Sequence, residues 1–169
     1  MAATYTLISV NYLSSASNTV SFTSIPTTYT DLRLSCCMKN AGGAYLRMLF
    51  NSNSYGNTLG YSKIQLQGGG TSVGWSGSGT QFDVTDINCE ANLSWNYTID
   101  IMGCNNTNTN FSWFGRGGVV VGGTTQKYLL TNGAVTGTST TTLTSIDLTA
   151  QGTAFSAGSR FQLFGITRA

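Results

Sequence analysis

The chain has 169 residues, of which 40% are hydrophobic and 8% are charged, and its formal net charge at pH 7 is +2. Disordered chains are rich in charge and poor in aromatic residues, so an aromatic content of 11% argues against disorder. The eight Lys and Arg residues are scattered singly, which leaves no basic cluster for specific binding of nucleic acid.

Apolar and polar residues alternate along most of the chain, and no long stretch has helical spacing. The first two expected strands lie at 4–13 and around Val20 and Phe22. A third strand places four residues on one apolar face, namely Leu32, Leu34, Cys36 and Met38. The single proline, Pro26, lies between the second and third strands, where it fixes φ and cannot donate a hydrogen bond. We expect an ordered corner there, at a crossing between two sheets.

After a tight turn at 41–43, the segment 44–51 predicts a strand with Leu46, Met48 and Phe50 on its buried face. Its other face is unusually apolar for a solvated one. Tyr45 and Leu49 on that face are therefore candidates for a contact between subunits.

The middle of the chain mixes loop and strand signals. Residues 51–60 predict a loop, and 61–67 predict a strand with one solvent-exposed face. The glycine-rich stretch 68–80 predicts a flexible loop that carries Trp75, because glycine is entropically costly in a strand. A short bulged strand is expected around Phe82, Val84 and Ile87.

The longest clean strand signal consists of five apolar residues of one parity, Leu93, Trp95, Tyr97, Ile99 and Ile101. A polar turn at 105–110 follows, and then a glycine-rich loop at 115–123 that leads into a buried strand at 119–121. Asn132 and Gly133 predict a hairpin turn. The last two strands are expected around Ile146 and Leu148, with Asp147 on the opposite face, and at 159–166, with Phe161, Leu163 and Gly165 on one face.

Short strands at spacings of about 8 to 15 residues, joined by Gly, Asn, Ser and Thr turns, predict an all-β fold. We expect a single domain over 1–169, an antiparallel β-sandwich of about eight to ten strands with a jelly-roll arrangement.

Several kinds of chemistry are disfavoured. The chain has no histidine, which removes His-activated nucleophiles and the commonest metal ligand. Asp31, Asp100 and Asp147 alternate with apolar neighbours and are expected on solvated strand faces, which argues against a pair of glycosidase carboxylates. The acidic segment 83–86 with Glu90 lacks the ligand density of a calcium loop. We therefore expect no enzyme activity, no metal and no cofactor.

The four cysteines, Cys36, Cys37, Cys89 and Cys104, lack the spacing of a zinc site. Buried free thiols are expected, with a bridge between Cys89 and Cys104 in oxidising surroundings as the alternative. Residues 1–13 do not resemble a secretory signal, and no apolar segment is long enough to span a membrane. We expect the protein to be made in the cytoplasm and not to associate with membranes.

Aromatic residues in glycine-rich surroundings are the remaining candidates for a binding site. Trp75, Trp113, Phe114 and Arg116 are residue types used by protein interfaces and by sites that stack on sugars. Packing in the core is the alternative for these residues.

Two segments, YTLISVNYLSSASNTVSFTSIPTTYTDLRLS at 5–35 and AGSRFQLFGITRA at 157–169, resemble a family of virion proteins of tailed bacteriophages, especially cyanophages. The resemblance covers roughly the first 55 and the last 25 residues. The middle of the chain is similar only in being rich in Gly, Ser and Asn. These motifs are structural, so the resemblance implies a β-sandwich virion module without catalysis.

The compact form of the chain favours a shell protein within that family, because it has no coiled-coil heptads and no collagen-like repeat. The resemblance implies a capsid decoration or cement protein that lies on the outer capsid surface, binds the major capsid protein and forms a homotrimer. The alternative is a receptor-binding module of a tail or fibre that binds host glycans. A carbohydrate-active enzyme is a third hypothesis, and it requires two carboxylates that face each other across a cleft.

Overall fold

The computed structural model describes residues 4–39, 45–51, 59–67, 71–79, 82–84, 93–105, 111–121, 125–135 and 142–168. This part of the chain is built from strands, and it contains no helix that is long and apolar enough to cross a membrane. The strands, in chain order, are β1 (Thr4–Tyr12), β2 (Thr19–Phe22), β3 (Asp31–Lys39), β4 (Tyr45–Phe50), β5 (Leu59–Gln67), β6 (Thr71–Gly79), β7 (Phe82–Asp83), β8 (Ser94–Met102), β9 (Ser112–Val121), β10 (Thr125–Val135), β11 (Ile146–Gln151) and β12 (Arg160–Thr167).

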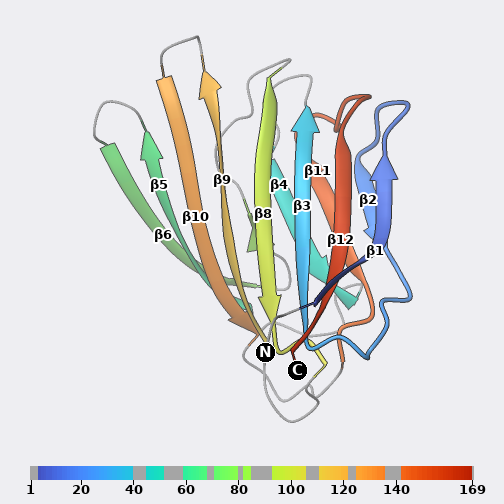
Figure 1. Cartoon of the computed structure of the whole chain (residues 1–169). Helices are drawn as coiled ribbons and strands as arrows, with labels where there is room; N and C mark the ends of the chain where they lie inside the picture. Colours follow the sequence, from blue (N-terminus) through green and yellow to red (C-terminus); the bar gives the residue numbers. More distant parts are fainter. Residues whose placement is uncertain are drawn as a thin grey trace.

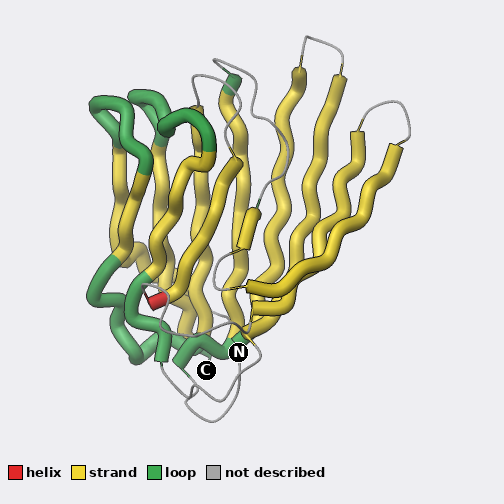
Figure 2. Tube along the Cα trace, turned by 180° about the vertical axis from the view of Figure 1, so that it is seen from behind, coloured by secondary structure: helices red, strands yellow, loops and turns green. Residues whose placement is uncertain are grey.

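The strands form two antiparallel sheets that pack face to face (Figure 1). The larger sheet has eight strands in the order β1-β12-β3-β8-β9-β10-β5-β6, and the smaller sheet has the order β2-β11-β4-β7. Seen from behind, the smaller sheet covers one side of the larger sheet, while β5 and β6 extend the larger sheet beyond it (Figure 2). The prediction of an all-β antiparallel sandwich is confirmed. The described residues hold twelve strands rather than eight to ten.

The core lies between the two sheets, where the alternating residues of several strands meet. All four apolar residues expected on one face of β3 are buried, and so are Leu46, Met48 and Phe50 of β4. Trp95, Tyr97, Ile99 and Ile101 of β8 are also buried, as the period of two predicts. Phe161 and Leu163 of β12 complete the pattern. The predicted alternation therefore identifies which face of each of these strands points inward.

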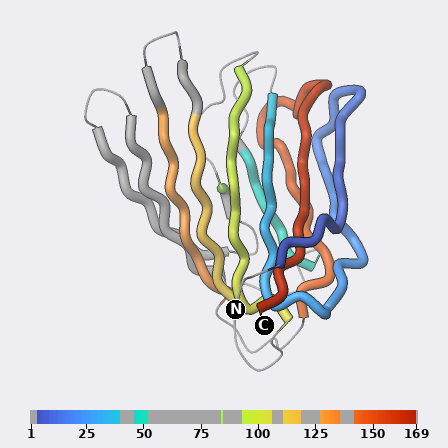
Figure 3. Tube along the Cα trace, in the orientation of Figure 1, coloured from blue at the N-terminus to red at the C-terminus, as the bar shows by residue number. Residues whose placement is uncertain are grey.

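The corner at Pro26 joins the two sheets, as predicted. β2 belongs to the four-stranded sheet and β3 to the eight-stranded sheet, so the segment between them crosses the sandwich. Ile25 is buried, and its N–H donates to the carbonyl of Thr144 at 2.9 Å. The first and last strands then meet in the larger sheet, where β1 pairs with β12 along its length (Figure 3).

Three glycine-rich loop predictions are wrong. Residues 71–79 form β6, which pairs with β5, and 115–121 continue β9 without a loop. Asn132 and Gly133 lie inside β10, opposite Phe114 and Trp113, rather than in a hairpin turn. The physical reason on β9 and β10 is packing. A Cβ at Gly133 would lie 2.0 Å from a ring carbon of Trp113, so the missing side chain makes room for the ring.

Some expected features fall outside the described residues. These are the turn at 41–43, most of the loop at 51–60, Ile87, residues 85–86 of the acidic segment together with Glu90, and all but the first residue of the turn at 105–110.

Candidate binding surface

The eight-stranded sheet has one face against the core and one face turned away from it, which we call the outer face. On β1 and β8 to β10, the outer face carries large apolar side chains that are exposed. A solvated face of an antiparallel sheet is normally polar, so a concentration of exposed apolar side chains indicates a contact surface. The exposed large apolar side chains among the described residues are Tyr5, Leu7, Val10, Tyr12, Met102, Phe114, Tyr128 and Leu130.

An ion pair lies between the two ends of this surface. Arg33 of β3 faces Asp100 of β8, and the guanidinium donates two hydrogen bonds to the carboxylate, at 2.5 Å from Nε and 3.0 Å from Nη2. The guanidinium carbon also lies 5.0 Å from the centre of the Tyr5 ring. The hydrogen bonds with Asp100 raise the pKa of Arg33. The charge is therefore paired, and the arginine side chain is held in place beside β1.

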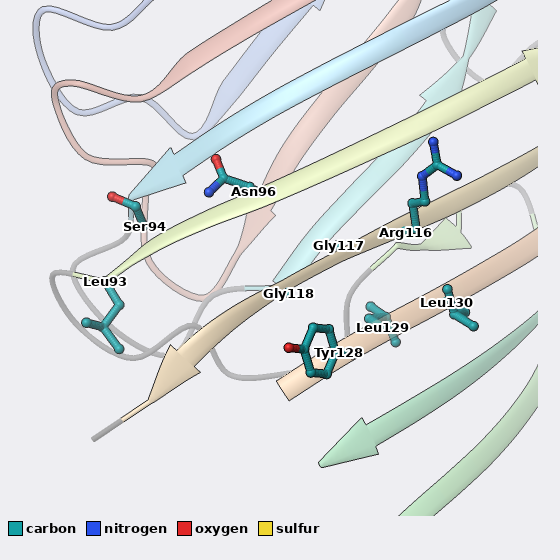
Figure 4. A pocket seen from close by; sticks show the side chains of 9 residues that line it. All are labelled: Leu93, Ser94, Asn96, Arg116, Gly117, Gly118, Tyr128, Leu129 and Leu130. Atoms are coloured by element: carbon teal, nitrogen blue, oxygen red, sulfur yellow. The ribbon is translucent and has the colours of Figure 1, made fainter. Parts of the chain in front are cut away.

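A shallow groove of about 680 Å³ opens over β8, β9 and β10. Figure 4 shows Asn96 on β8, Arg116 on β9, and Tyr128 and Leu130 on β10. Tyr128 and Leu130 are exposed, and so are Arg116 and Asn96. The residues that line the groove are Leu93, Ser94, Asn96, Arg116, Gly117, Gly118, Tyr128, Leu129 and Leu130.

The glycines of β9 explain why this part of the face is hollow. Gly118 pairs with Tyr128, and a Cβ at Gly118 would lie 3.0 Å from the Tyr128 ring. Because Gly118 has no side chain, the ring can lie close to the backbone of β9, and the space beside it stays open. Arg116 pairs with Leu130 in the same register, so a cationic group and an apolar group stand next to each other at the groove.

The arginine of the groove is available for a partner. The described ion pairs join Arg33 to Asp100 and Arg168 to Asp31, and none involves Arg116. The groove thus combines an aromatic ring, an aliphatic side chain, a free guanidinium and an amide. These groups can bind another molecule through stacking, apolar contact and hydrogen bonds.

The structure separates the six residues predicted for a binding site. Phe114 and Arg116 lie on the outer face of β9, as exposed candidates. Leu49 is half-buried on β4, in the other sheet, with its buried neighbours turned toward the core. Trp75 lies in β6 and Tyr45 in β4, and their side chains are outside the described part.

The sixth candidate, Trp113, is a core residue. Its side chain is 1% exposed, and its ring centre lies 5.7 Å from that of Phe50 in the opposite sheet. Trp113 and Phe114 are neighbours in a strand and point to opposite faces. The prediction of a surface role for Trp113 is therefore wrong, and packing in the core, the alternative, describes it.

The prediction that Asp31 is solvated is also wrong. Asp31 is 5% exposed, and its carboxylate accepts hydrogen bonds from the backbone N–H of Gly103 at 2.9 Å and from Nε of Arg168 at 2.5 Å. The carboxylate thus joins the start of β3 to the turn after β8 and to the end of the chain beyond β12. These hydrogen bonds and the ion pair with Arg168 offset the cost of burying the Asp31 carboxylate.

The cysteines of the described residues are free thiols. Cys36 and Cys104 are buried and Cys37 is partly buried, while Cys89 lies outside the described residues. Burial raises the pKa of the Cys104 thiol to about 12, and it raises the pKa of Cys36 as well. Such thiols are poor nucleophiles at neutral pH. Within the described residues, no three metal-ligating side chains lie together.

Sequence reasoning missed the exposed residues of β1 and β10. Tyr5 and Leu7 alternate with polar residues, a pattern that ordinarily marks a buried face. Tyr128 and Leu130 lie in the run YLL, which has no alternation that would show which residues point outward. The signal that could have identified β10 is Leu129 between them, because a buried residue in a strand directs both neighbours to the opposite face.

Comparison of the chain with protein-family models, with curated proteins and with solved structures finds no match. The resemblance to phage virion proteins thus stays a prediction from the motifs at 5–35 and 157–169.

Proposed function

We propose that this chain is a non-catalytic structural protein of a phage virion, a decoration or cement protein that binds the major capsid protein on the outside of the shell. The observation that supports the proposal most is the outer face of β9 and β10. There Phe114, Arg116, Tyr128 and Leu130 are exposed side by side on a sheet. Aromatic residues and arginine on a rigid scaffold are the residue types that contribute most to protein interfaces.

The mechanism of such a protein is mass action. A ligand that binds the assembled shell and not its dissociated subunits stabilises the shell in proportion to occupancy. A β-sandwich suits this role because its binding face is built on paired strands and needs little ordering when it binds. The low charge of the chain, 8% of residues, also limits repulsion between closely packed copies.

The test is to add the purified protein to shells that lack it and to measure both binding and the temperature at which the shells rupture. We expect the rupture temperature to rise with occupancy. Tyr128→Ala and Leu130→Ala should weaken binding by about tenfold or more, as expected for a hot spot. Thr167→Ala, at the exposed end of β12, is the control and should bind like the wild type. Equal rupture temperatures with and without bound protein would contradict a cement role.

Glycan binding is the second candidate function, and one specific observation favours it. The exposed Tyr128 ring lies over Gly118 in the groove, with Asn96 and Arg116 nearby. An aromatic face with amide and guanidinium donors beside it can stack on a sugar and hydrogen-bond to its hydroxyls. Binding of host polysaccharide that is lost in Tyr128→Ala, with no binding to shells, would favour a receptor-binding role over the cement role.

A further inference from the structure

β1 is an edge strand of the eight-stranded sheet. Among the described strands it pairs only with β12, so its other edge presents unpaired backbone N–H and C=O groups over nine residues. Such an edge is a template for another strand. Proteins usually protect long edges with charged residues or proline, and the strand sequence TYTLISVNY contains neither.

Four apolar side chains of β1 point to the outer face, whereas Ile8 packs against the core. Tyr5 and Leu7 are each 50% exposed, Val10 is 44% exposed and Tyr12 is 67% exposed. In a regular strand, Leu7 and Val10 would point to opposite faces because they are three positions apart. The register with β12 shifts between Leu7 and Ser9, and this bulge brings both halves of the apolar pattern to one face.

The resulting pattern is symmetric about the bulge. Two copies of β1 can pair antiparallel about a two-fold axis between Ile8 and Ser9. Tyr5 of each copy then faces Tyr12 of the other, and Leu7 of each copy faces Val10 of the other, all on the same face. Aromatic pairs and aliphatic pairs directly opposite each other are the combinations that stabilise neighbouring strands.

We propose that β1 pairs with β1 of a second copy of this chain, which joins two eight-stranded sheets into one continuous sheet. The occupant is a second copy because the edge is complementary to itself in register and carries no charge that would repel an identical strand. The cation nearest to Tyr5, Arg33, is already neutralised by Asp100. A bulge can twist an edge away from a partner. In this register the two bulges lie together at the axis, and the segments on either side of them make the pairing.

The inference predicts a specific response to charge. In Leu7→Lys with Val10→Lys, two ammonium groups face each other on both sides of the axis. In Leu7→Lys with Val10→Glu, an ammonium faces a carboxylate at the same positions. Both variants remove the same apolar side chains, so a difference between them reports the register. Thr98→Lys, which places a charge on the outer face of β8 opposite Arg116, is the control for a surface lysine.

Analytical ultracentrifugation over a range of protein concentrations measures the result, and circular dichroism confirms that each variant is folded. We expect a wild-type dimer, a dissociation constant raised by about tenfold or more in the double-lysine variant, and substantial recovery in the lysine–glutamate variant. Thr98→Lys should dimerise like the wild type. Hydrogen exchange of the β1 amides should slow as dimer forms.

A wild-type chain that stays monomeric would overturn the inference, and so would a trimer, because antiparallel pairing of two β1 edges closes as a dimer. Equal dissociation constants for the two charge variants would overturn the register. None of these measurements uses capsid shells or glycans. Their outcome is therefore independent of the proposed function.

Discussion

Aromatic rings packed over glycines are the recurring device of this sandwich at the level of single residues. A Cβ at Gly133 would meet Trp113, one at Gly115 would meet the ring of Tyr97, and one at Gly165 would lie 2.4 Å from the ring of Tyr29. At each of these positions the absence of a side chain leaves room for an aromatic ring in or beside the core. Glycine weakens a strand by its backbone entropy, and the buried ring offsets that cost.

Gly133→Ala should destabilise the protein by about 1 to 3 kcal/mol, the usual cost of overpacking a core. The added methyl group would lie 2.0 Å from Cζ2 of Trp113, and the ring is confined because it is 1% exposed and packs beside Phe50. The measurement is the free energy of unfolding in urea. Asn132→Ala, the exposed neighbour on the opposite face of β10, is the control and should cost less.

A double variant separates a clash from a general effect on the strand. Trp113→Phe removes the ring atoms that the new methyl group would meet, so Gly133→Ala should cost less in the Trp113→Phe background than in the wild type. Contacting residues with a shared clash show this non-additivity. If the losses of unfolding free energy in the two variants were additive, the absence of a side chain at Gly133 would not be what accommodates the Trp113 ring.

At the level of elements, one residue joins the end of β4 to the segment that leads into β11. Asn51 is buried and has a φ of 46°, in the left-handed region that asparagine tolerates better than most residues. Its side-chain oxygen accepts hydrogen bonds from the N–H groups of Thr144 at 2.7 Å and Ser145 at 3.0 Å, and its Nδ2 donates to the carbonyl of Thr142 at 2.8 Å. This amide thus fixes a segment outside the strands, which backbone hydrogen bonds from Ile25 to Thr144 and from Leu143 to Cys104 also hold.

Asn51→Ala should destabilise the protein by about 2 to 4 kcal/mol, because it leaves the partly buried N–H groups of Thr144 and Ser145 without their acceptor and places alanine at a positive φ. Asn96→Ala, on the exposed face of β8, is the control and should change the free energy of unfolding by less than about 0.5 kcal/mol. Thermal or urea unfolding measures both. Equal costs for the two variants would contradict the role of Asn51 as a tie between β4 and β11.

The elements that could be predicted from the sequence are those with one buried and one open face. β3, β8 and β12 have this pattern, and their buried residues are those that alternation indicates. β6 and the glycine-rich part of β9 could not be predicted, because glycine has no side chain to show a period and is typical of loops. The partner that makes Gly115 favourable in a strand is Tyr97 on β8, a contact set by tertiary structure.

The candidate surface could be predicted only in part for a related reason. Phe114 and Arg116 were identified as residue types suited to binding, but the same argument selected Trp113, which points to the core. The strand parity that separates Trp113 from Phe114 depends on recognising β9 as a strand. On β1, alternation by itself indicates a buried face, and only the sheet order shows that this strand lies at an edge.

At the scale of the whole molecule, the sandwich buries three weak acids, all of which stay protonated in the folded state. Burial raises the pKa values of Cys36, Tyr97 and Cys104 above their ordinary values of 9.0 for cysteine and 10.0 for tyrosine. Tyr97 also shares a buried hydrogen bond of 2.6 Å with Thr131. The chain has no histidine, so it lacks the side chain that ordinarily titrates near neutral pH.

These facts predict how stability depends on pH. Above about pH 9 the unfolded chain releases protons that the folded chain retains, so the folded state binds more protons and the free energy of unfolding falls as the pH rises. Between about pH 6 and pH 8 these groups are protonated in both states, and the melting temperature should stay nearly constant. Melting temperatures across this range and up to about pH 11 measure the effect.

Removing a buried acid should make the alkaline decline shallower. Cys36→Ala lowers stability at every pH through the cavity it leaves, but it also removes one proton that the folded state retains, so its melting temperature should fall less steeply above about pH 9 than that of the wild type. Cys37→Ala is the matched control, because Cys37 is the adjacent, partly exposed thiol. An alkaline slope that is unchanged in Cys36→Ala would mean that this buried thiol does not couple folding to pH.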